Sequence, residues 1–157
     1  MENEQVLLVY KPAGIAVQSG SVGQMDLEHQ LLGFLTSRGK GREIPYLAVV
    51  HRLDQPVEGV LLFAKTKEAA AACSAQIQLM TGRHHQIRVQ LSHAGMPIVG
   101  DRKYGECRAE AAGQKNTEEL LLCAASLTFE NPVNGKTEKI TVSPKGGGFQ
   151  KFGQVQI

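Results

Sequence analysis

The sequence of 157 residues has few cysteines, no long apolar run and little net charge, and each shortage excludes a class of protein. Cys73, Cys107 and Cys123 are an odd number without CxxC spacing, which argues against a disulfide framework and a zinc-cysteine site. No apolar run approaches the roughly 18 residues that span a bilayer, and the opening residues MENE lack the basic start of a secretory signal. We therefore expect a cytoplasmic protein without membrane association.

The net charge of +2 is too small to indicate a nucleic-acid partner by itself. It does not exclude one, because the charge is unevenly distributed. Residues 79–108 contain five Lys or Arg against Asp101 and Glu106. Such a basic segment would attract phosphate in a salt-dependent way.

The chain alternates short apolar runs with helical patterns, and its length suits one domain with a single core. Asp26 and Thr66 are suited to cap two helices, and Asn134 with Gly135 is a hairpin turn signal. The continuous apolar run at 59–64 is typical of a strand covered on both faces. The patterns predict strands at 6–10, 47–50, 59–64, 120–129 and 139–143, and helices at about 27–37, 67–78 and within 81–93.

The candidate chemistry centres on the run HRLDQPVEG at residues 51–59, which joins two apolar runs. A partly buried Asp54 needs a charged partner, and Arg52, Arg83 and Arg88 are the candidates. An ionised, oriented carboxylate can attack a sugar carbon or stabilise an oxocarbenium-like charge. Glu58 is the only nearby second carboxylate. From the residues alone, Asp54 as a structural ion pair and Asp54 as a catalyst are equally favoured.

Three other interpretations of the polar residues carry less weight. His84 and His85 would point apart on a helix, and no carboxylate completes a site, so we predict that no metal is bound. A cysteine-histidine hydrolase is disfavoured because no cysteine lies in a glycine-rich turn. Lys11, at a strand end beside Pro12, is more simply a solvated lysine than a functional one.

The motifs, in their order along the chain, resemble those of the RluA-type pseudouridine synthases, and they cover most of it. They are KPAG at 11–14, HRLD at 51–54 with EG at 58–59, TGRHHQIR at 81–88, GMPIVGD at 95–101 with YG at 104–105, and LTF at 127–129 with NP at 131–132.

This resemblance implies an α/β (α+β) fold, in which one catalytic domain over residues 1–157 has a mixed, mostly antiparallel sheet flanked by helices. It implies an enzyme that isomerises specific uridines in rRNA or tRNA to pseudouridine, without cofactor or metal. Asp54 falls on the catalytic aspartate that acts on the ribose, and Arg88 on its basic partner. Arg52 falls on the arginine that can fill the gap left by a flipped uridine. We expect a monomer whose further contacts to structured RNA come from His51, Lys11, Arg83, His85 and Gln86.

The chain departs from the family beside the aspartate, where Val57 and Glu58 replace a usual Thr-Ser pair. We expect Glu58 to face solvent or RNA rather than Asp54, because two close carboxylates would raise a pKa and weaken the nucleophile.

A larger departure lies at the junction of Gln78 and Leu79, where the family has several dozen more residues that include an active-site tyrosine. Tyr10, Tyr46 and Tyr104 belong to other segments, so none takes that role. Intact motifs on both sides of the junction favour a missing stretch of a longer protein over a natural deletion.

The alternatives to an enzyme are a non-catalytic RNA-binding relative and a structural protein with an Asp54–Arg88 pair. We also expect a loose tail over about 145–157.

Overall fold

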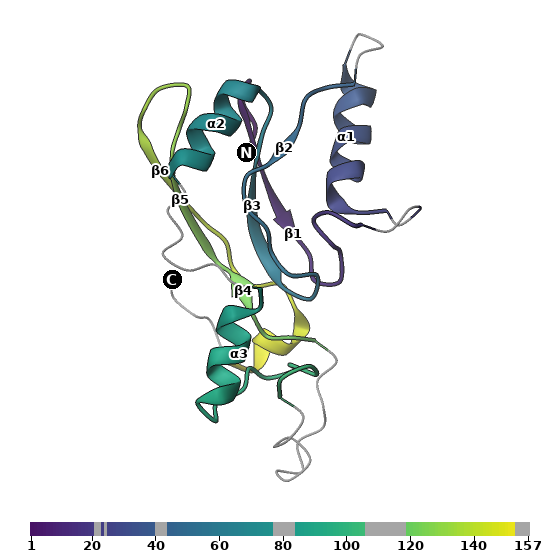
Figure 1. Cartoon of the computed structure of the whole chain (residues 1–157), viewed down its shortest axis with the longest axis vertical. Coiled ribbons are helices and arrows are strands. Elements are labelled where there is room, and N and C mark those ends of the chain that lie inside the picture. Colours follow the sequence, from purple (N-terminus) through teal and green to yellow (C-terminus); the bar gives the residue numbers. More distant parts are fainter. Residues whose placement is uncertain (21–22, 24, 40–43, 77–83, 106–118, 153–157) are drawn as a thin grey trace.

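The computed structural model of the chain describes residues 1–20, 23, 25–39, 44–76, 84–105 and 119–152 (Figure 1). Helices and two sheets are mixed along the chain, which confirms the predicted α+β class. None of the described helices is long and apolar enough to cross a membrane. The elements are β1 (Val6–Lys11), α1 (Leu27–Arg38), β2 (Ala48–Val49), β3 (Glu58–Ala64), α2 (Lys67–Gln76), α3 (Gln86–His93), β4 (Cys123–Ala124), β5 (Ser126–Glu130), β6 (Thr137–Thr141) and the 3-10 helix η1 (Gly147–Phe152).

Strand β3 organises the larger sheet. It pairs antiparallel with β1, from Val6 opposite Ala64 to Lys11 opposite Gly59, and antiparallel with the short β2. At its start it also pairs in parallel with β4, whereas β5 and β6 form a separate antiparallel hairpin. The sheet pairing is therefore mostly antiparallel, as predicted. The strand predicted at 120–129 is in fact two short strands that belong to different sheets.

The core lies on both faces of the β1–β3 pair. All seven residues of β3 are buried, which confirms a strand covered on both sides. Alternate side chains point to opposite faces of a strand, and Figure 1 shows α1 and α2 on opposite sides of this pair. The cluster on the α2 and β5 side contains Val6, Leu8, Val60, Leu62, Ala64, Ala69, Cys73 and Phe129, and that on the α1 side contains Leu7, Val17, Leu27, Leu35, Leu47, Leu61 and Phe63.

Both predicted helix caps are present. The Asp26 carboxylate accepts a hydrogen bond from the His29 backbone N–H at 2.9 Å, and Thr66 Oγ1 accepts one from the Ala69 N–H at 3.1 Å. Each cap satisfies a donor that the first helical turn leaves without a partner. The two caps fix where α1 and α2 begin, and so where each helix meets the sheet.

Gly59 lets β3 approach β4 at the point where the Asp54 loop ends. Its φ is 138°, and a Cβ atom there would lie 2.5 Å from the Ala124 carbonyl oxygen. Only glycine fits such a conformation and such a close backbone approach. The glycine thus brings the segment after residue 119 against the end of the loop.

Glu58 is 3% exposed, so the prediction that it faces solvent or RNA is wrong. Its carboxylate accepts hydrogen bonds from Tyr10 Oη at 2.6 Å and from the N–H groups of Lys145 and Gly146 at 3.1 Å. Burial and the neighbouring Glu58 raise the pKa of Tyr10, which keeps its hydroxyl a donor at neutral pH. A buried carboxylate is tolerated when donors satisfy it in this way.

Two predictions about the chain's organisation stay predictions. The junction of Gln78 and Leu79 lies outside the described residues. Of the tail expected to be loose, Gly147–Phe152 forms η1, and residues 153–157 lie outside the described part.

Candidate active site

Asp54 lies in the loop between β2 and β3, with a side chain that is 25% exposed. The loop is closed by a hydrogen bond from the Val57 N–H to the Asp54 carbonyl at 3.0 Å, and Val57 itself is buried. Gln55 accepts a backbone hydrogen bond from Gly14 at 2.9 Å, which ties the loop to the turn after β1. The carboxylate is therefore presented by a loop that is anchored at several points.

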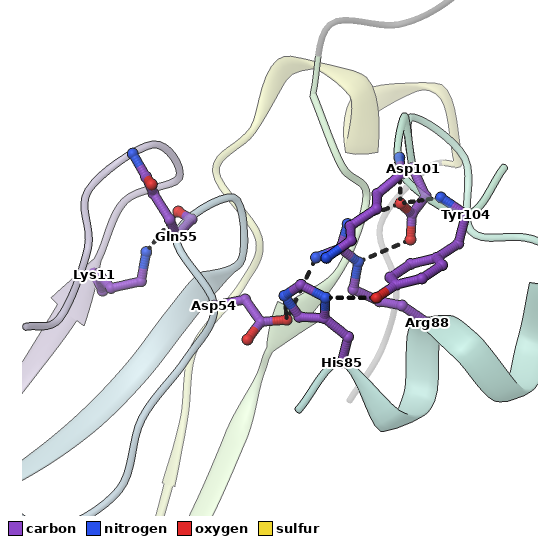
Figure 2. A network of polar contacts seen from close by, with 8 residues as sticks. Lys11, Asp54, Gln55, His85, Arg88, Asp101 and Tyr104 are labelled. Atoms are coloured by element: carbon purple, nitrogen blue, oxygen red, sulfur yellow. Dashed lines mark hydrogen bonds and ion pairs between the residues drawn. The ribbon is translucent and has the colours of Figure 1, made fainter. Parts of the chain in front are cut away.

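Lys11 supports this loop from below the surface and is 0% exposed, so its interpretation as a solvated lysine is wrong. Its Nζ donates to the carbonyl oxygens of Pro12 at 3.0 Å, Ile15 at 2.7 Å and Gln55 at 3.0 Å. Figure 2 shows the ammonium directed at Gln55, the residue after Asp54. Burial lowers the pKa of Lys11 to about 8. Its proposed contact with RNA stays a prediction, and the geometry supports a structural role.

Replacing Lys11 with Met should destabilise the protein by about 2–4 kcal/mol at pH 7, because three buried carbonyls lose a charged donor. The pH dependence has a definite sign. Between pH 8 and pH 10.5 the folded protein loses the Lys11 proton while the unfolded chain keeps it. Wild type should therefore gain stability relative to Lys11→Met across this window, by up to about 3 kcal/mol.

Urea unfolding of both proteins at several pH values measures this difference. Lys67→Met, at an exposed position of α2, is the control and should change stability by less than about 0.5 kcal/mol. A stability difference between wild type and Lys11→Met that does not vary with pH would contradict the buried ammonium.

Helix α3 buries its arginine and exposes an apolar residue. Arg88 is 6% exposed and Ile87 is 56% exposed. Arg88 donates from Nε and Nη2 to the two carboxylate oxygens of Asp101, both at 2.8 Å. Asp101 also accepts from the N–H groups of Lys103 and Tyr104 at 3.1 Å. Burial of a guanidinium requires pairing of this kind.

The same arginine reaches Asp54, as predicted (Figure 2). Arg88 Nη1 lies 3.4 Å and His85 Nε2 lies 3.3 Å from Asp54 Oδ2. Hydrogen bonds from Arg88 lower the pKa of Asp101, and the pair raises the pKa of Arg88, so both stay charged at neutral pH. Within the described residues all contacts of the Asp54 carboxylate go to Oδ2. Oδ1 thus has no hydrogen-bond or ion-pair partner in the part of the chain that the structure describes.

His85 links Asp54 to Tyr104, whose hydroxyl lies 2.9 Å from His85 Nδ1. Burial lowers the pKa of His85, so its ring is mainly neutral at pH 7. One tautomer satisfies both contacts: Tyr104 Oη–H donates to Nδ1, and Nε2–H donates to Asp54. The ring of Tyr104 also lies 5.2 Å from the Arg88 guanidinium, a cation–π distance.

The reasons for excluding a metal were wrong. The rings of His84 and His85 stack with centroids 3.6 Å apart instead of pointing apart, because His85 precedes α3 in a left-handed conformation with φ 57°. A carboxylate also completes the group, since one ligand atom each of Asp54, His84 and His85 lies within 4.8 Å of the others.

The other predicted site residues lie in different surroundings. Arg52 is exposed in the loop. His51 is half-buried with an Nδ1 that has no partner among the described residues, and burial lowers its pKa. Gln86 is half-buried at the start of α3, and Arg83 lies outside the described part.

Asp101 and Tyr104, which complete the polar network, were not among the predicted site residues. The signal was present, because both residues lie in the matched motifs at 95–101 and 104–105. Motif membership alone did not show that Asp101 would take two of the arginine's hydrogen bonds.

Pseudouridine synthases are among the known proteins that this chain resembles. A family model described as RNA pseudouridylate synthase matches residues 5–78. Ribosomal large subunit pseudouridine synthase C of Yersinia pestis is 27% identical over 207 residues, which cover 88% of this chain and 63% of that protein. The enzyme of the same name from Haemophilus influenzae is 25% identical over 210 residues, covering 90% of this chain and 63% of that protein.

The fold also matches a solved structure, human RNA Pseudouridylate Synthase Domain Containing 4, with a TM-score of 0.70 and 16% identity. The match covers 91% of this chain and 87% of that one, and at this identity it shows the fold alone. The chain is therefore similar in sequence and in fold to RNA pseudouridine synthases.

Within that class, the relatives are named ribosomal large subunit synthases, which agrees with the resemblance of the motifs to the RluA type. It spans about 63% of the length of the curated relatives that it matches. Alignments of 207 and 210 residues exceed the 157 residues of the chain, so the relatives contain residues that have no counterpart here.

Proposed function

We propose that this domain isomerises uridine to pseudouridine in structured RNA, with Asp54 acting on the ribose. The observation that carries the proposal is the arrangement around that carboxylate. Arg88 and His85 both contact Oδ2, while Oδ1 has no contact among the described residues. An oriented carboxylate with one oxygen available suits attack at the anomeric carbon or assistance to departure of the base.

The reaction breaks the bond between C1′ of the ribose and N1 of uracil, and rejoins C1′ to C5 after the base turns. Asp54 would stabilise the sugar while the base is detached, and Arg88 would hold Asp54 in position. The proton that leaves C5 has to be accepted by a base or water in the site. The proposal assigns no cofactor to any of these steps.

RNA contact is proposed for the exposed residues around this loop. Arg52 is exposed two residues before Asp54, where it can enter the stack vacated by a flipped uridine. Arg102 and Lys103 are exposed beside the Asp101 network and supply positive charge for the phosphate backbone. The names of the relatives favour RNA of the large ribosomal subunit as substrate. A monomeric state and a cytoplasmic location stay predictions.

The test is to incubate the purified chain with large-subunit rRNA and, separately, with tRNA, and to map pseudouridine by carbodiimide labelling and primer extension. We expect new pseudouridine at defined positions of the rRNA. RNA binding that weakens with salt, but yields no pseudouridine, would support the non-catalytic RNA-binding alternative. If the RNA neither binds nor yields pseudouridine, the Asp54–Arg88 pair is a purely structural feature.

A further inference from the structure

Two imidazoles and a carboxylate converge beside the Asp54 loop, although they come from separate segments of the chain. One ligand atom each of Asp54, His84 and His85 lies within 4.8 Å of the other two. His84 is exposed and the other two residues are half-buried, so an ion can reach the group from solvent. We propose that these three side chains form a binding site for a divalent transition-metal ion.

The backbone at His85 makes the arrangement possible. Adjacent histidines within a helix would project in different directions. His85 instead has φ 57° and ψ 22°, which is an uncommon conformation for a residue other than glycine and costs on the order of 1 kcal/mol. As a result the two rings stack, with centroids 3.6 Å apart and planes at 28°. The strained residue thus places two imidazoles on the same side of the loop.

Tyr104 prepares His85 to act as a ligand. Its hydroxyl lies 2.9 Å from Nδ1, while Nε2 lies 3.3 Å from Asp54 Oδ2. A hydrogen bond at one ring nitrogen orients a histidine and leaves the other nitrogen to the metal. When an ion replaces the Nε2 proton, that proton moves to Nδ1, and the Tyr104 hydroxyl rotates to accept the new hydrogen bond. The ring stays neutral throughout.

The ligand set determines the class of ion. Two imidazoles and one carboxylate suit Zn²⁺, Co²⁺ or Ni²⁺, whereas Mg²⁺ and Ca²⁺ prefer oxygen ligands. Three protein ligands leave at least one position for water or a substrate oxygen. The two histidines therefore distinguish this site from a surface carboxylate that attracts cations without selectivity.

Arg88 limits the affinity, because its Nη1 lies 3.4 Å from the same Asp54 oxygen. Its two hydrogen bonds to Asp101 are shorter, at 2.8 Å, so Arg88 keeps a partner when Asp54 turns toward an ion. The ion binds, but against the repulsion of a nearby guanidinium, and we expect moderate rather than tight affinity. If the proposed function holds, an ion on Asp54 occupies the catalytic carboxylate and inhibits isomerisation.

Titration calorimetry with Zn²⁺, and absorption spectroscopy with Co²⁺, test the site without any RNA. We expect one ion per chain, a Co²⁺ spectrum without the charge-transfer bands of thiolate ligands, and affinity at least about tenfold weaker in His84→Ala. His93→Ala is the control and should bind like wild type, because His93 is exposed at the end of α3, away from the proposed ligands in sequence. Equal binding by His84→Ala and His93→Ala, thiolate bands, or no binding by wild type would each overturn the proposal.

Inhibition is measured separately, by adding Zn²⁺ to the pseudouridine assay with wild type and His84→Ala. Wild type should lose activity at Zn²⁺ concentrations that leave His84→Ala active. An inactive chain that still binds the ion through His84 would contradict the proposed function and leave the metal site intact. An active chain whose Zn²⁺ inhibition is unchanged in His84→Ala would overturn the inhibitory role.

Discussion

Replacing Asp54 with Asn should lower pseudouridine formation by at least about a thousandfold, which corresponds to about 4 kcal/mol of transition-state stabilisation. The amide has the size of the carboxylate, and its oxygen can still accept a hydrogen bond from Arg88 or His85. It has no negative charge to offer the sugar and is a far weaker nucleophile. The side chain is one-quarter exposed and makes two long contacts among the described residues, so its replacement should leave the fold intact.

The measurement is single-turnover pseudouridine formation, with RNA binding and circular dichroism recorded on the same samples. Glu68→Gln, which makes the same carboxylate-to-amide change at an exposed position of α2, should retain wild-type activity. Because we propose other residues for flipping and binding the RNA, Asp54→Asn should still bind it. Activity within tenfold of wild type would remove Asp54 from the chemistry.

The central pairing of this site was predictable because it rests on short motifs with a known order. The run at 51–59 predicted a loop between strands, and the family resemblance of the run at 81–88 singled out Arg88 among three candidate arginines. Hydrophobic pattern and cap residues likewise predicted β1, β3, α1 and α2. These features depend on neighbouring residues, and local sequence contains that information.

Burial of charge was not predictable in the same way. Lys11 and Glu58 look like surface residues in the sequence, and both are buried. One of the three carbonyls that accept a hydrogen bond from Lys11 belongs to Gln55, and Glu58 accepts from the N–H groups of Lys145 and Gly146. These partners are distant along the chain from the charge that they stabilise. The free-energy cost of burying a charge depends on such partners, so only the folded structure shows that hydrogen bonds offset this cost.

Backbone conformation was the second limit. Sequence periodicity assumes regular geometry, and it placed the rings of His84 and His85 apart. The left-handed His85 breaks that assumption immediately before α3. Non-glycine residues adopt this conformation rarely, and they do so where surrounding contacts hold them, here Tyr104 and Asp54.

Replacing Asp101 with Asn should both destabilise the protein, by about 3–5 kcal/mol, and slow the reaction, because the buried Arg88 loses its close ion pair and keeps the longer one to Asp54. Asp101 does not contact Asp54 and acts through Arg88, so it is a positioning residue. We expect kcat to fall by about 10–100-fold with a smaller change in KM, since Arg88 would then hold Asp54 in a less defined position. Urea unfolding and steady-state kinetics measure the two effects.

The double variant Arg88→Met, Asp101→Leu separates stability from function. Replacing both members of a buried ion pair with apolar residues is often neutral or stabilising, so this variant should recover most of the stability that Asp101→Asn loses. It should lose activity, because among the described residues Asp54 would keep only its contact with His85, on Oδ2. If the double variant were both stable and active, the pair would serve the fold alone, and Asp54 would be oriented by His85 without the arginine.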